Sequence, residues 1–363
     1  MKKGLLIINF IIISILFSAC VAPGAKERKS IAISTMDTFI GGYVYIEPSK
    51  WDDVFDQMKA IYHEYHVLTD NFTAQAEGVH GVYYINERAQ LSEVSATVEI
   101  DQLLYDLLEV GIYVTEDTNG YFNMTMGKII DVWKDLIKEY QTGDEISLSA
   151  VNQTMELAQS IELIDDPITL TESSGKYYVT LKKGAKLDLG AIAKGYATQK
   201  VADYLKSEGV FEFLINGGSS SVVFGEQNRR NKEGKFTIGL IDPLDVVNHM
   251  DLIDYQARNY ATFADINHNV TTSGSYEQFV KHENTWYHHI ISPLTKKPEN
   301  YYMTVSLIGV DAGLMDAYST ALFSMPKDVL TSFLALKDFE VVSYEFSGLI
   351  TNYNQTDRFK ELT

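Results

Sequence analysis

The sequence predicts a mixed α/β or α+β domain and argues against a plain doubly wound parallel sheet. Runs with the three- and four-residue spacing of amphipathic helices alternate irregularly with short strand-like runs rich in β-branched and aromatic residues. The 363-residue chain is 45% hydrophobic, which is enough for a sizeable core. The sequence contains no internal repeat and no low-complexity tract, and its length allows one large domain or two intertwined halves.

The first thirty residues predict an export signal followed by a tether. Lys2 and Lys3 precede an apolar run, residues 5–17, which is too short to span a membrane comfortably. "FSAC" resembles a bacterial lipoprotein processing box, in which the cysteine, here Cys20, becomes the lipidated first residue; an ordinary secretory signal is the alternative. The protein would then be attached to the cell membrane by its lipid alone and face outside the cytoplasm. The expected organisation is a signal peptide (1–19), a lipid-anchored tether (20–30) and one domain (31–363).

The charge argues against a nucleic-acid-binding protein, and the cysteine content excludes a disulfide-stabilised one. The formal net charge is −19, and an acidic surface repels phosphate backbones, so we expect no nucleic-acid partner. A small anionic ligand held by local donors or by a metal remains compatible with this charge. Cys20 is the only cysteine, which excludes a disulfide framework within the chain.

Spacing and turn residues predict the elements of the N-terminal half. Two strands within 31–46 are expected to turn at Gly41-Gly42, and a loop is expected over 69–80. A strand hairpin is predicted over 168–181, with its turn at 173–175. Helices are predicted over 51–68, 98–116 and 149–160, with another from about Met126.

The C-terminal half is predicted to be richer in strands. A helix follows the segment 187–197 and ends near Ser207, and a second helix covers 315–324. Strands are predicted over 211–216, 221–224, 236–241, 260–263, 270–273, 286–291, 304–310, 340–344 and 348–351.

The stretch "LDLGAIAKGYA", residues 187–197, predicts a strand end, a glycine turn and the start of a helix. The free amides and the dipole of a helix N-terminus suit a phosphate or another anion. Lys194 would lie about one turn into the helix and reach the same anion, while Asp188 would accept from a ligand hydroxyl or imide. The alternative is an ordinary turn with an exposed lysine, since the glycine spacing fits neither a Walker loop nor a dinucleotide fingerprint.

The stretch "MDAYSTALF", residues 315–323, places two oxygen ligands on one helix face. Asp316 and Thr320 are four residues apart. A carboxylate and a hydroxyl are hard ligands of the kind Mg²⁺ prefers, although water, a carbonyl and ligand phosphates would have to complete the octahedron. The alternative is a helix start capped by Asp316, with Thr320 packed.

Three further segments offer groups for chemistry or binding. In "WYHHIISPLTKKP" a strand carries His288 and His289 on opposite faces, so one histidine would enter a cleft and act as a general base while the other is solvated. In "TNGYFNMTMG" Tyr121 and Phe122 offer an aromatic platform for a planar ring. Glycine and hydroxyl residues in 216–221 and 271–279 suit close approach of a ligand to the backbone. Structural histidines, core aromatics and ordinary turns are the alternatives.

The order of these segments along the chain resembles the ApbE family of flavin transferases. The sequence "MDT" (36–38) is followed by "NGYFNMTMG", "LDLGAIAKGYA", "NGG", "TSGSYE", "HHIISPLTKKP" and "MDAYSTALF", which covers the chain from about residue 31 onward. The resemblance implies a T-fold-type architecture, with mixed or antiparallel sheets flanked by helices. It also implies the family's reaction, in which FAD is split with Mg²⁺, FMN is joined by a phosphoester to a Thr or Ser hydroxyl of an exported target protein, and AMP leaves.

The resemblance assigns roles to particular residues. The Ala191 carbonyl, Asp316 and Thr320 match the Mg²⁺ ligands, and His289 is similar to the residue before the family's "IDP", which makes it the candidate base beside the catalytic Asp316. The expected FAD contacts are Met36, Tyr121, Phe122, Asn123, Asp188, Lys194 and Ile291.

The chain departs from the family pattern at several positions. Asp37 replaces the usual glycine of "MGT", and Asn123 replaces a common aspartate. Ser292 replaces the aspartate of "IDP", and Lys296-Lys297 replace "TG". Two alternatives to the transferase remain: an FAD pyrophosphatase with water as the acceptor, and a lipoprotein that only binds flavin.

Overall fold

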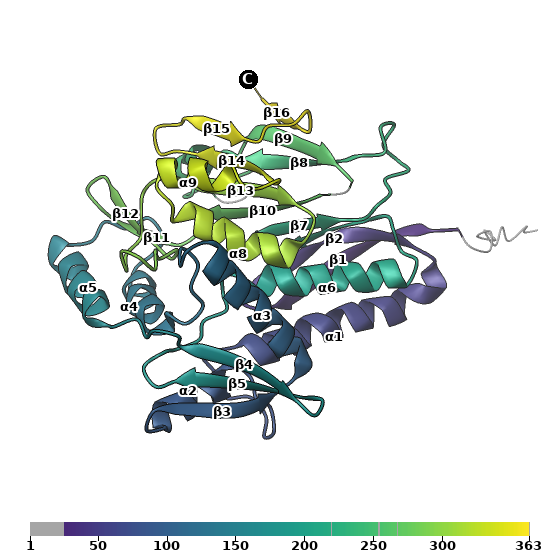
Figure 1. Cartoon of the computed structure of the whole chain (residues 1–363). Helices are drawn as coiled ribbons and strands as arrows, with labels where there is room; N and C mark the ends of the chain where they lie inside the picture. The colour runs from purple at the N-terminus through teal and green to yellow at the C-terminus, as the bar shows by residue number, and fades with distance from the viewer. Residues whose placement is uncertain (1–24, 219, 253–254, 267, 363) are drawn as a thin grey trace, which may run out of the picture.

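A central eight-stranded sheet organises the computed structural model, which describes residues 25–218, 220–252, 255–266 and 268–362 (Figure 1). The predicted signal peptide and Cys20 lie outside the described residues. Every neighbouring pair of strands in this sheet is antiparallel, which confirms the α+β class and the expected antiparallel architecture. In spatial order the strands are β1 (Glu27–Thr35), β2 (Thr38–Ile46), β6 (Phe213–Gly217), β7 (Ser221–Phe224), β10 (Asn269–Gly274), β13 (Thr304–Gly309), β14 (Glu340–Tyr344) and β15 (Ile350–Tyr353).

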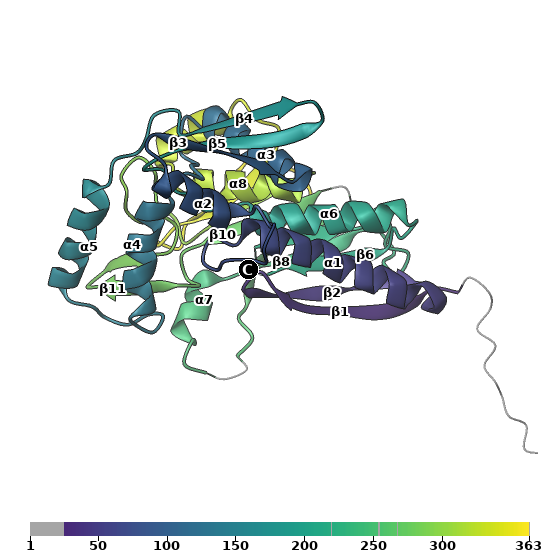
Figure 2. The same ribbon diagram turned by 90° about the horizontal axis from the view of Figure 1, so that it is seen from below.

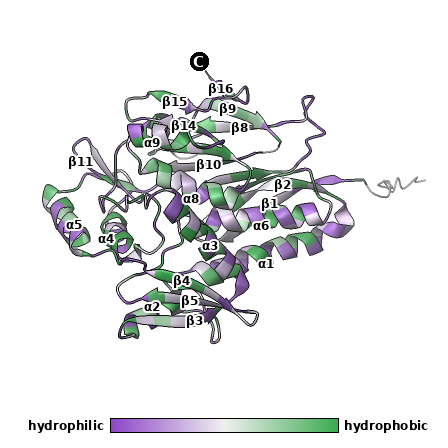
Figure 3. Cartoon of the chain, viewed as in Figure 1, coloured by the Kyte–Doolittle hydropathy of each residue, from purple (hydrophilic) through white to green (hydrophobic). Residues whose placement is uncertain are grey.

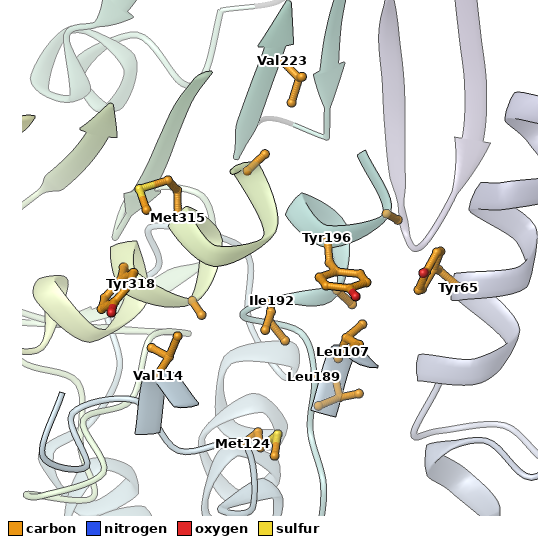
Figure 4. Packing of buried hydrophobic residues seen from close by; sticks show 14 of the residues in the cluster. Tyr65, Leu107, Val114, Met124, Leu189, Ile192, Tyr196, Val223, Met315 and Tyr318 are labelled. Atoms are coloured by element: carbon orange, nitrogen blue, oxygen red, sulfur yellow. The ribbon is translucent and has the colours of Figure 1, made fainter. Parts of the chain in front are cut away.

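Four helices share the largest hydrophobic core with the inner faces of β1 and β2. They are α1 (Trp51–Thr69), α3 (Gln102–Asp117), α6 (Ala193–Ser207) and α8 (Ala312–Phe323). Figure 2 shows α1 and α6 running alongside the β1–β2 hairpin. Apolar and polar residues alternate along α1 and α6 in Figure 3, as expected for helices with one buried face. In the interior, the rings of Tyr65 and Tyr196 meet edge to face with centroids 5.5 Å apart (Figure 4).

Three smaller sheets and the remaining helices surround this centre. The sheets are β16-β9-β8 (Phe359–Glu361, Asn259–Asp265, Phe236–Ile241), β3-β5-β4 (Ser95–Ile100, Lys176–Lys182, Ile168–Ser173) and the hairpin β11-β12 (Phe279–His282, Thr285–His288). The other helices are η1 (Pro48–Lys50), α2 (Val82–Leu91), α4 (Gly127–Lys138), α5 (Leu148–Ser160), α7 (Pro243–Asn248) and α9 (Lys327–Leu334). Helices α4 and α5 form a separate apolar cluster with residues of the β11–β12 hairpin. Within the described ranges, no helix has both the length and the apolar character needed to cross a membrane.

The predicted elements differ from the structure at three instructive places. The β1–β2 turn falls at Met36 and Asp37, which have φ values of 52° and 55°, and not at Gly41-Gly42, which lie inside β2. Aspartate tolerates the left-handed region, so Asp37 fills the place of the family's glycine. The helix predicted over 98–116 begins only at Gln102, because residues 95–100 pair with β5 as a strand. Helices α2, α7 and α9 were not predicted.

Candidate active site

The stretch "LDLGAIAKGYA" forms a tight corner that leads into α6. The Asp188 N–H donates to the Met124 carbonyl, and the preceding Lys186 N–H donates to the Thr125 carbonyl, but these residues do not form the predicted strand of a sheet. Leu189 and Ile192 anchor the corner in the core, beside Leu107 and Tyr196 (Figure 4). The Asp188 carboxylate then closes the turn, since its Oδ1 accepts from the Gly190 N–H at 2.9 Å.

Helices α6 and α8 cross where a glycine of one meets an acid of the other. The Gly195 N–H donates to Oδ2 of Asp316 at 2.8 Å, across 121 residues of sequence. A Cβ on Gly195 would lie 2.5 Å from both the Ala312 carbonyl oxygen and the Asp316 Cβ, so only glycine allows this approach. The crossing brings the two segments of the predicted metal site together.

The same hydrogen bond leaves a backbone carbonyl available. In a regular α-helix the N–H of Gly195 would donate to the carbonyl of Ala191, four residues earlier. Here that N–H is used by Asp316, and within the described residues no backbone or side-chain donor reaches the Ala191 oxygen. Ala191 therefore presents a free acceptor beside the first turn of α6, which is the state expected of a carbonyl ligand.

Asp316 lies in surroundings that favour a nearby positive charge. Burial raises the pKa of its carboxyl to about 6, although the charge of Lys194 and the Gly195 N–H oppose that rise. Thr320 Oγ1 lies on the same helix face, 3.5 Å from the Asp316 carbonyl oxygen and 3.5 Å from Ser273 Oγ of β10. A carboxylate, a hydroxyl and a free carbonyl are hard oxygen donors that fit Mg²⁺.

No denser metal cluster competes with this arrangement among the described residues. They contain no group of three or more His, Cys, Asp and Glu placed to hold a metal ion. A cation between Asp316 and Ala191 would therefore need further oxygens from a substrate phosphate or from water.

Replacing Gly195 with Ala is expected to destabilise the fold by about 1–3 kcal/mol, because the added methyl overpacks the α6–α8 crossing. Urea unfolding should show a lower midpoint with an unchanged slope. Gly41→Ala is the matched control, since its Cβ would meet only the Phe39 ring at 3.4 Å. Equal stability of the two variants would contradict the close crossing.

Asp188 is a hydrogen-bonding hub rather than a free acceptor. Its Oδ2 accepts from Lys134 Nζ of α4 at 2.8 Å and from Asn71 Nδ2 at 3.0 Å. Burial would raise its pKa, but the Lys134 charge and these hydrogen bonds outweigh burial and hold the pKa below its ordinary value. Three bonds already occupy the carboxylate, so it retains little capacity for the ligand contact predicted from the sequence.

Lys134 and Asn71 were not predicted, and they bring two more segments to the site. Asn71 lies in the α1–α2 loop and is 8% exposed, and its Oδ1 has no hydrogen-bond partner in the described chain. Lys134 also lies 5.1 Å from the ring centroid of Phe72, which is 52% exposed. Nothing in the sequence links Lys134 to an aspartate 54 residues away, because only the packing of α4 brings them together.

The two histidines have different surroundings from those predicted. His288 is fully buried and not solvated: its Nε2 donates to the Glu299 carbonyl at 3.1 Å, and burial lowers its pKa to about 3. His289 is half-buried and its Nδ1 faces the Gln278 carbonyl at 3.4 Å. Burial lowers its pKa, and the charges of Lys194 and Lys134 add to this effect while Glu277 opposes it. His289 therefore shares its surroundings with the lysines of the corner.

The predicted aromatic platform is only partly present. Phe122 is 2% exposed and belongs to the main core, so it offers no ring face to a ligand. Tyr121 is half-buried and retains exposed surface. Asn123 folds back on its own loop, where its Oδ1 accepts from the Thr125 N–H and hydroxyl at 2.8 and 2.7 Å. Phe122 can act only through its backbone.

The remaining predicted contacts lie on two loops. Met36 is half-buried at the β1–β2 turn and packs against the main core. Ile291 is buried in the α4–α5 cluster, and the following Ser292 starts a hydrogen-bonded loop that ends at Lys297. Trp133 of α4 donates its indole N–H to the Lys296 carbonyl at 2.9 Å. The departures at Ser292 and Lys296 thus form a loop fastened to α4.

Replacing Lys134 with Met is expected to weaken binding of the FAD that the resemblance implies and to raise its KM about tenfold or more, because the buried Asp188 loses its ion-pair partner and the corner is no longer held in place. Lys138→Met is the matched control: Lys138 lies one turn further along α4 and is also 5.1 Å from the Phe72 ring. Lys134→Arg should restore most of the affinity. Steady-state kinetics would measure the KM, and FAD titration would measure the affinity. Equal effects of the two Met variants would contradict the role of Lys134 in holding Asp188.

Comparison with known proteins identifies the family of this chain. Residues 36–343 match the model of the ApbE family. The FAD:protein FMN transferase of Klebsiella pneumoniae is 28% identical over 230 residues, covering 63% of this chain and 64% of that relative. The enzyme of the same name from Treponema pallidum is 26% identical over 235 residues, covering 63% and 61%. The matches thus span less than two thirds of these relatives' length.

Solved structures show the shared fold. The ApbE protein of Thermotoga maritima superposes with a TM-score of 0.70 at 20% identity, over 90% of this chain and 97% of that one. The flavin transferase ApbE of Vibrio cholerae gives a TM-score of 0.66 at 18% identity, over 90% and 97%. Because the family model spans most of the chain, and the crossing of α6 and α8 joins the two most specific motifs, this protein belongs to the ApbE family.

Proposed function

We propose that this protein transfers FMN from FAD to a Thr or Ser hydroxyl of an exported target protein in a Mg²⁺-dependent reaction. The acceptor oxygen bonds to the FMN phosphorus, the bond to the bridging oxygen of the pyrophosphate breaks, and AMP leaves with the electron pair. The proposal is supported above all by one observation: the free Ala191 carbonyl lies beside the first turn of α6, where the buried Asp316 carboxylate accepts from Gly195.

The charges of the site suit a pyrophosphate. Ala191, Asp316 and Thr320 would hold Mg²⁺, which when bound would neutralise phosphate charge. Lys194 extends from the first turn of α6, with its Nζ 3.3 Å from the Gly190 carbonyl. The corner and the helix start thus orient an anion, and phosphoryl transfer depends chiefly on such positioning and on electrostatic stabilisation.

His289 is the proposed general base. Its lowered pKa keeps the imidazole neutral near pH 7, and a neutral ring can accept a proton. If Nδ1 carries the hydrogen toward the Gln278 carbonyl, Nε2 is left as the acceptor for the hydroxyl proton of the target.

The cellular setting is proposed from the sequence. The "FSAC" box supports lipidation at Cys20 and attachment to the cell membrane, outside the cytoplasm, where exported acceptor proteins are found. An acidic chain with no expected nucleic-acid partner is compatible with that setting.

One assay separates the proposal from its rivals. The purified chain is incubated with FAD, Mg²⁺ and an exported acceptor protein, and the products are separated on a denaturing gel and by chromatography. Flavin fluorescence that stays with the denatured acceptor supports transfer, and it should be lost when EDTA removes Mg²⁺. Free FMN and AMP without labelled acceptor would indicate a pyrophosphatase, and intact bound FAD would indicate a flavin-binding lipoprotein.

A further inference from the structure

Positive charge gathers at the end of α6 opposite to the candidate active site. Two short segments carry it: "KERK" at 26–29, where β1 begins, and "RRNKEGK" at 229–235, in the β7–β8 loop. They contain seven cations and two acids, in a chain whose net charge is −19. We call the exposed side chains of Lys26, Arg28, Arg229, Arg230 and Lys232 the basic end.

The basic end surrounds a shallow, open hollow. Lys26, Glu212, Arg229 and Arg230 line a hollow of about 480 Å³. The buried Glu212 holds Arg230 with both carboxylate oxygens at 2.9 Å. Lys26 and Arg229 instead face neutral partners, the Gly209 carbonyl at 3.4 Å and the Gln227 side chain at 3.1 Å. Their charges are therefore available to an anion.

Tyrosines accompany the arginines on the outer face of β2. The Arg230 guanidinium lies 3.4 Å from the ring centroid of Tyr45, and that of Arg28 lies 4.6 Å from the ring centroid of Tyr43. Both tyrosines are half-buried. An apolar ring with a polar tip beside a long cationic side chain is the combination that suits the headgroup region of a bilayer.

The position of the basic end matches the proposed attachment. Lys26 contacts Gly209, just beyond the last residue of α6, whereas Gly195 and Asp316 meet at its first turn. The fifteen residues of α6 separate the two ends by about 22 Å. Figure 1 shows the start of β1 and the far end of α6 at the same end of the molecule. Five residues, 21–25, separate Cys20 from Lys26, so a lipid there would hold Lys26 within about 20 Å of the membrane.

We propose that the basic end rests on an anionic phospholipid surface, with a headgroup phosphate in the hollow, and that this contact points the active site away from the membrane. The inference rests on the proposed membrane attachment, but it does not require flavin transfer. The acidic remainder of the chain is repelled by the same surface, so attraction at one end and repulsion elsewhere select one orientation. An acceptor protein would then approach from the N-terminal end of α6, which faces away from the lipid.

Hydrogen exchange of the full chain on vesicles tests this orientation. One set of vesicles is pure phosphatidylcholine and the other contains about a third phosphatidylglycerol. We expect amides of 25–30 and 226–235 to exchange at least about threefold more slowly on the anionic vesicles only, and to lose that protection in about 0.5 M salt, where screening is strong. Equal exchange on both vesicles, whether fast or slow, would overturn the proposal, since an anchor alone makes no distinction between the lipids.

Paired variants locate the effect. Arg229→Ser with Lys232→Ser should abolish the lipid-specific protection while leaving flavin transfer in detergent unchanged. Lys176→Ser with Lys183→Ser removes the same charge from exposed positions, at the start of β5 and one residue beyond its end, and should leave the protection intact. If both pairs lose it, net charge and not the basic end is responsible, and the proposal fails. Because exchange is read without FAD, a failure here is distinguishable from a failure of the proposed reaction.

Discussion

Replacing Asp316 with Asn is expected to reduce FMN transfer at least about 10³-fold, which corresponds to about 4 kcal/mol of transition-state stabilisation. The amide can still fill the space at the α6–α8 crossing, but it supplies no negative charge for a cation beside the Ala191 carbonyl. The turnover of FAD to a labelled acceptor measures the loss. Asp311→Asn is the control, because Asp311 caps the same helix through the Leu314 N–H and is exposed. Activity within tenfold of the parent would refute the metal assignment.

The same substitution should make the protein more stable at neutral pH. Folding raises the carboxyl pKa from about 4 to about 6, so between these values the folded state binds more protons than the unfolded state. Stability therefore falls as pH rises from 4 to 6 and stays lower above pH 6, by up to roughly 3 kcal/mol. Asp316→Asn should lack this dependence. Urea unfolding at pH 5 and pH 8 measures it, and a thermal shift with Mg²⁺ should appear in the parent only.

Replacing His289 with Gln is expected to slow transfer by about 10²–10⁴-fold, the range for loss of a general base. FAD affinity should change less than about twofold, because the imidazole is assigned to the acceptor hydroxyl rather than to the dinucleotide. A fall in FAD affinity equal to the fall in rate would instead make His289 a binding residue. His282→Gln is the control in the β11–β12 hairpin that precedes His289, where the ring contacts the Ile146 carbonyl.

The pH profile of the parent should report the same two groups. The pKa of His289 lies below its ordinary value and that of Asp316 is about 6. Activity should therefore be sustained from pH 8 down to about pH 6 and fall in more acidic solution, as Asp316 and His289 take up protons. If activity already began to fall above pH 7 as the solution was acidified, the roles assigned to Asp316 and His289 would be contradicted.

The sequence predicted those parts of the site whose geometry is local. The distance of four residues between Asp316 and Thr320 fixes a shared helix face, and the Gly190 turn predicts the helix start. The amides expected to be free there are mostly bonded already: Gly190 donates to Asp188, Ile192 and Ala193 donate to Leu189, and Gly195 donates to Asp316. The pairing of the two segments came from the resemblance, because 121 residues separate Gly195 from Asp316 and spacing does not encode such a contact.

What the sequence missed depends on tertiary packing. Whether Phe122 faces a ligand or the core is decided by its neighbours in space, and so is the ion pair between Lys134 and Asp188. The turn at Met36 and Asp37 was missed because Gly41-Gly42 is the stronger local turn signal, whereas pairing with the distant strand β6 keeps those glycines inside β2.

The hydrogen bond from Gly195 to Asp316 also ties catalytic competence to completion of the fold. The free carbonyl and the buried acid exist as a pair only after α8, near the end of the chain, has docked on α6. A nascent or translocating polypeptide that lacks this docking has no assembled centre with which to cleave a dinucleotide. Under the proposed export as an unfolded chain, the protein would thus remain inert toward cytoplasmic FAD and would become active only at its destination.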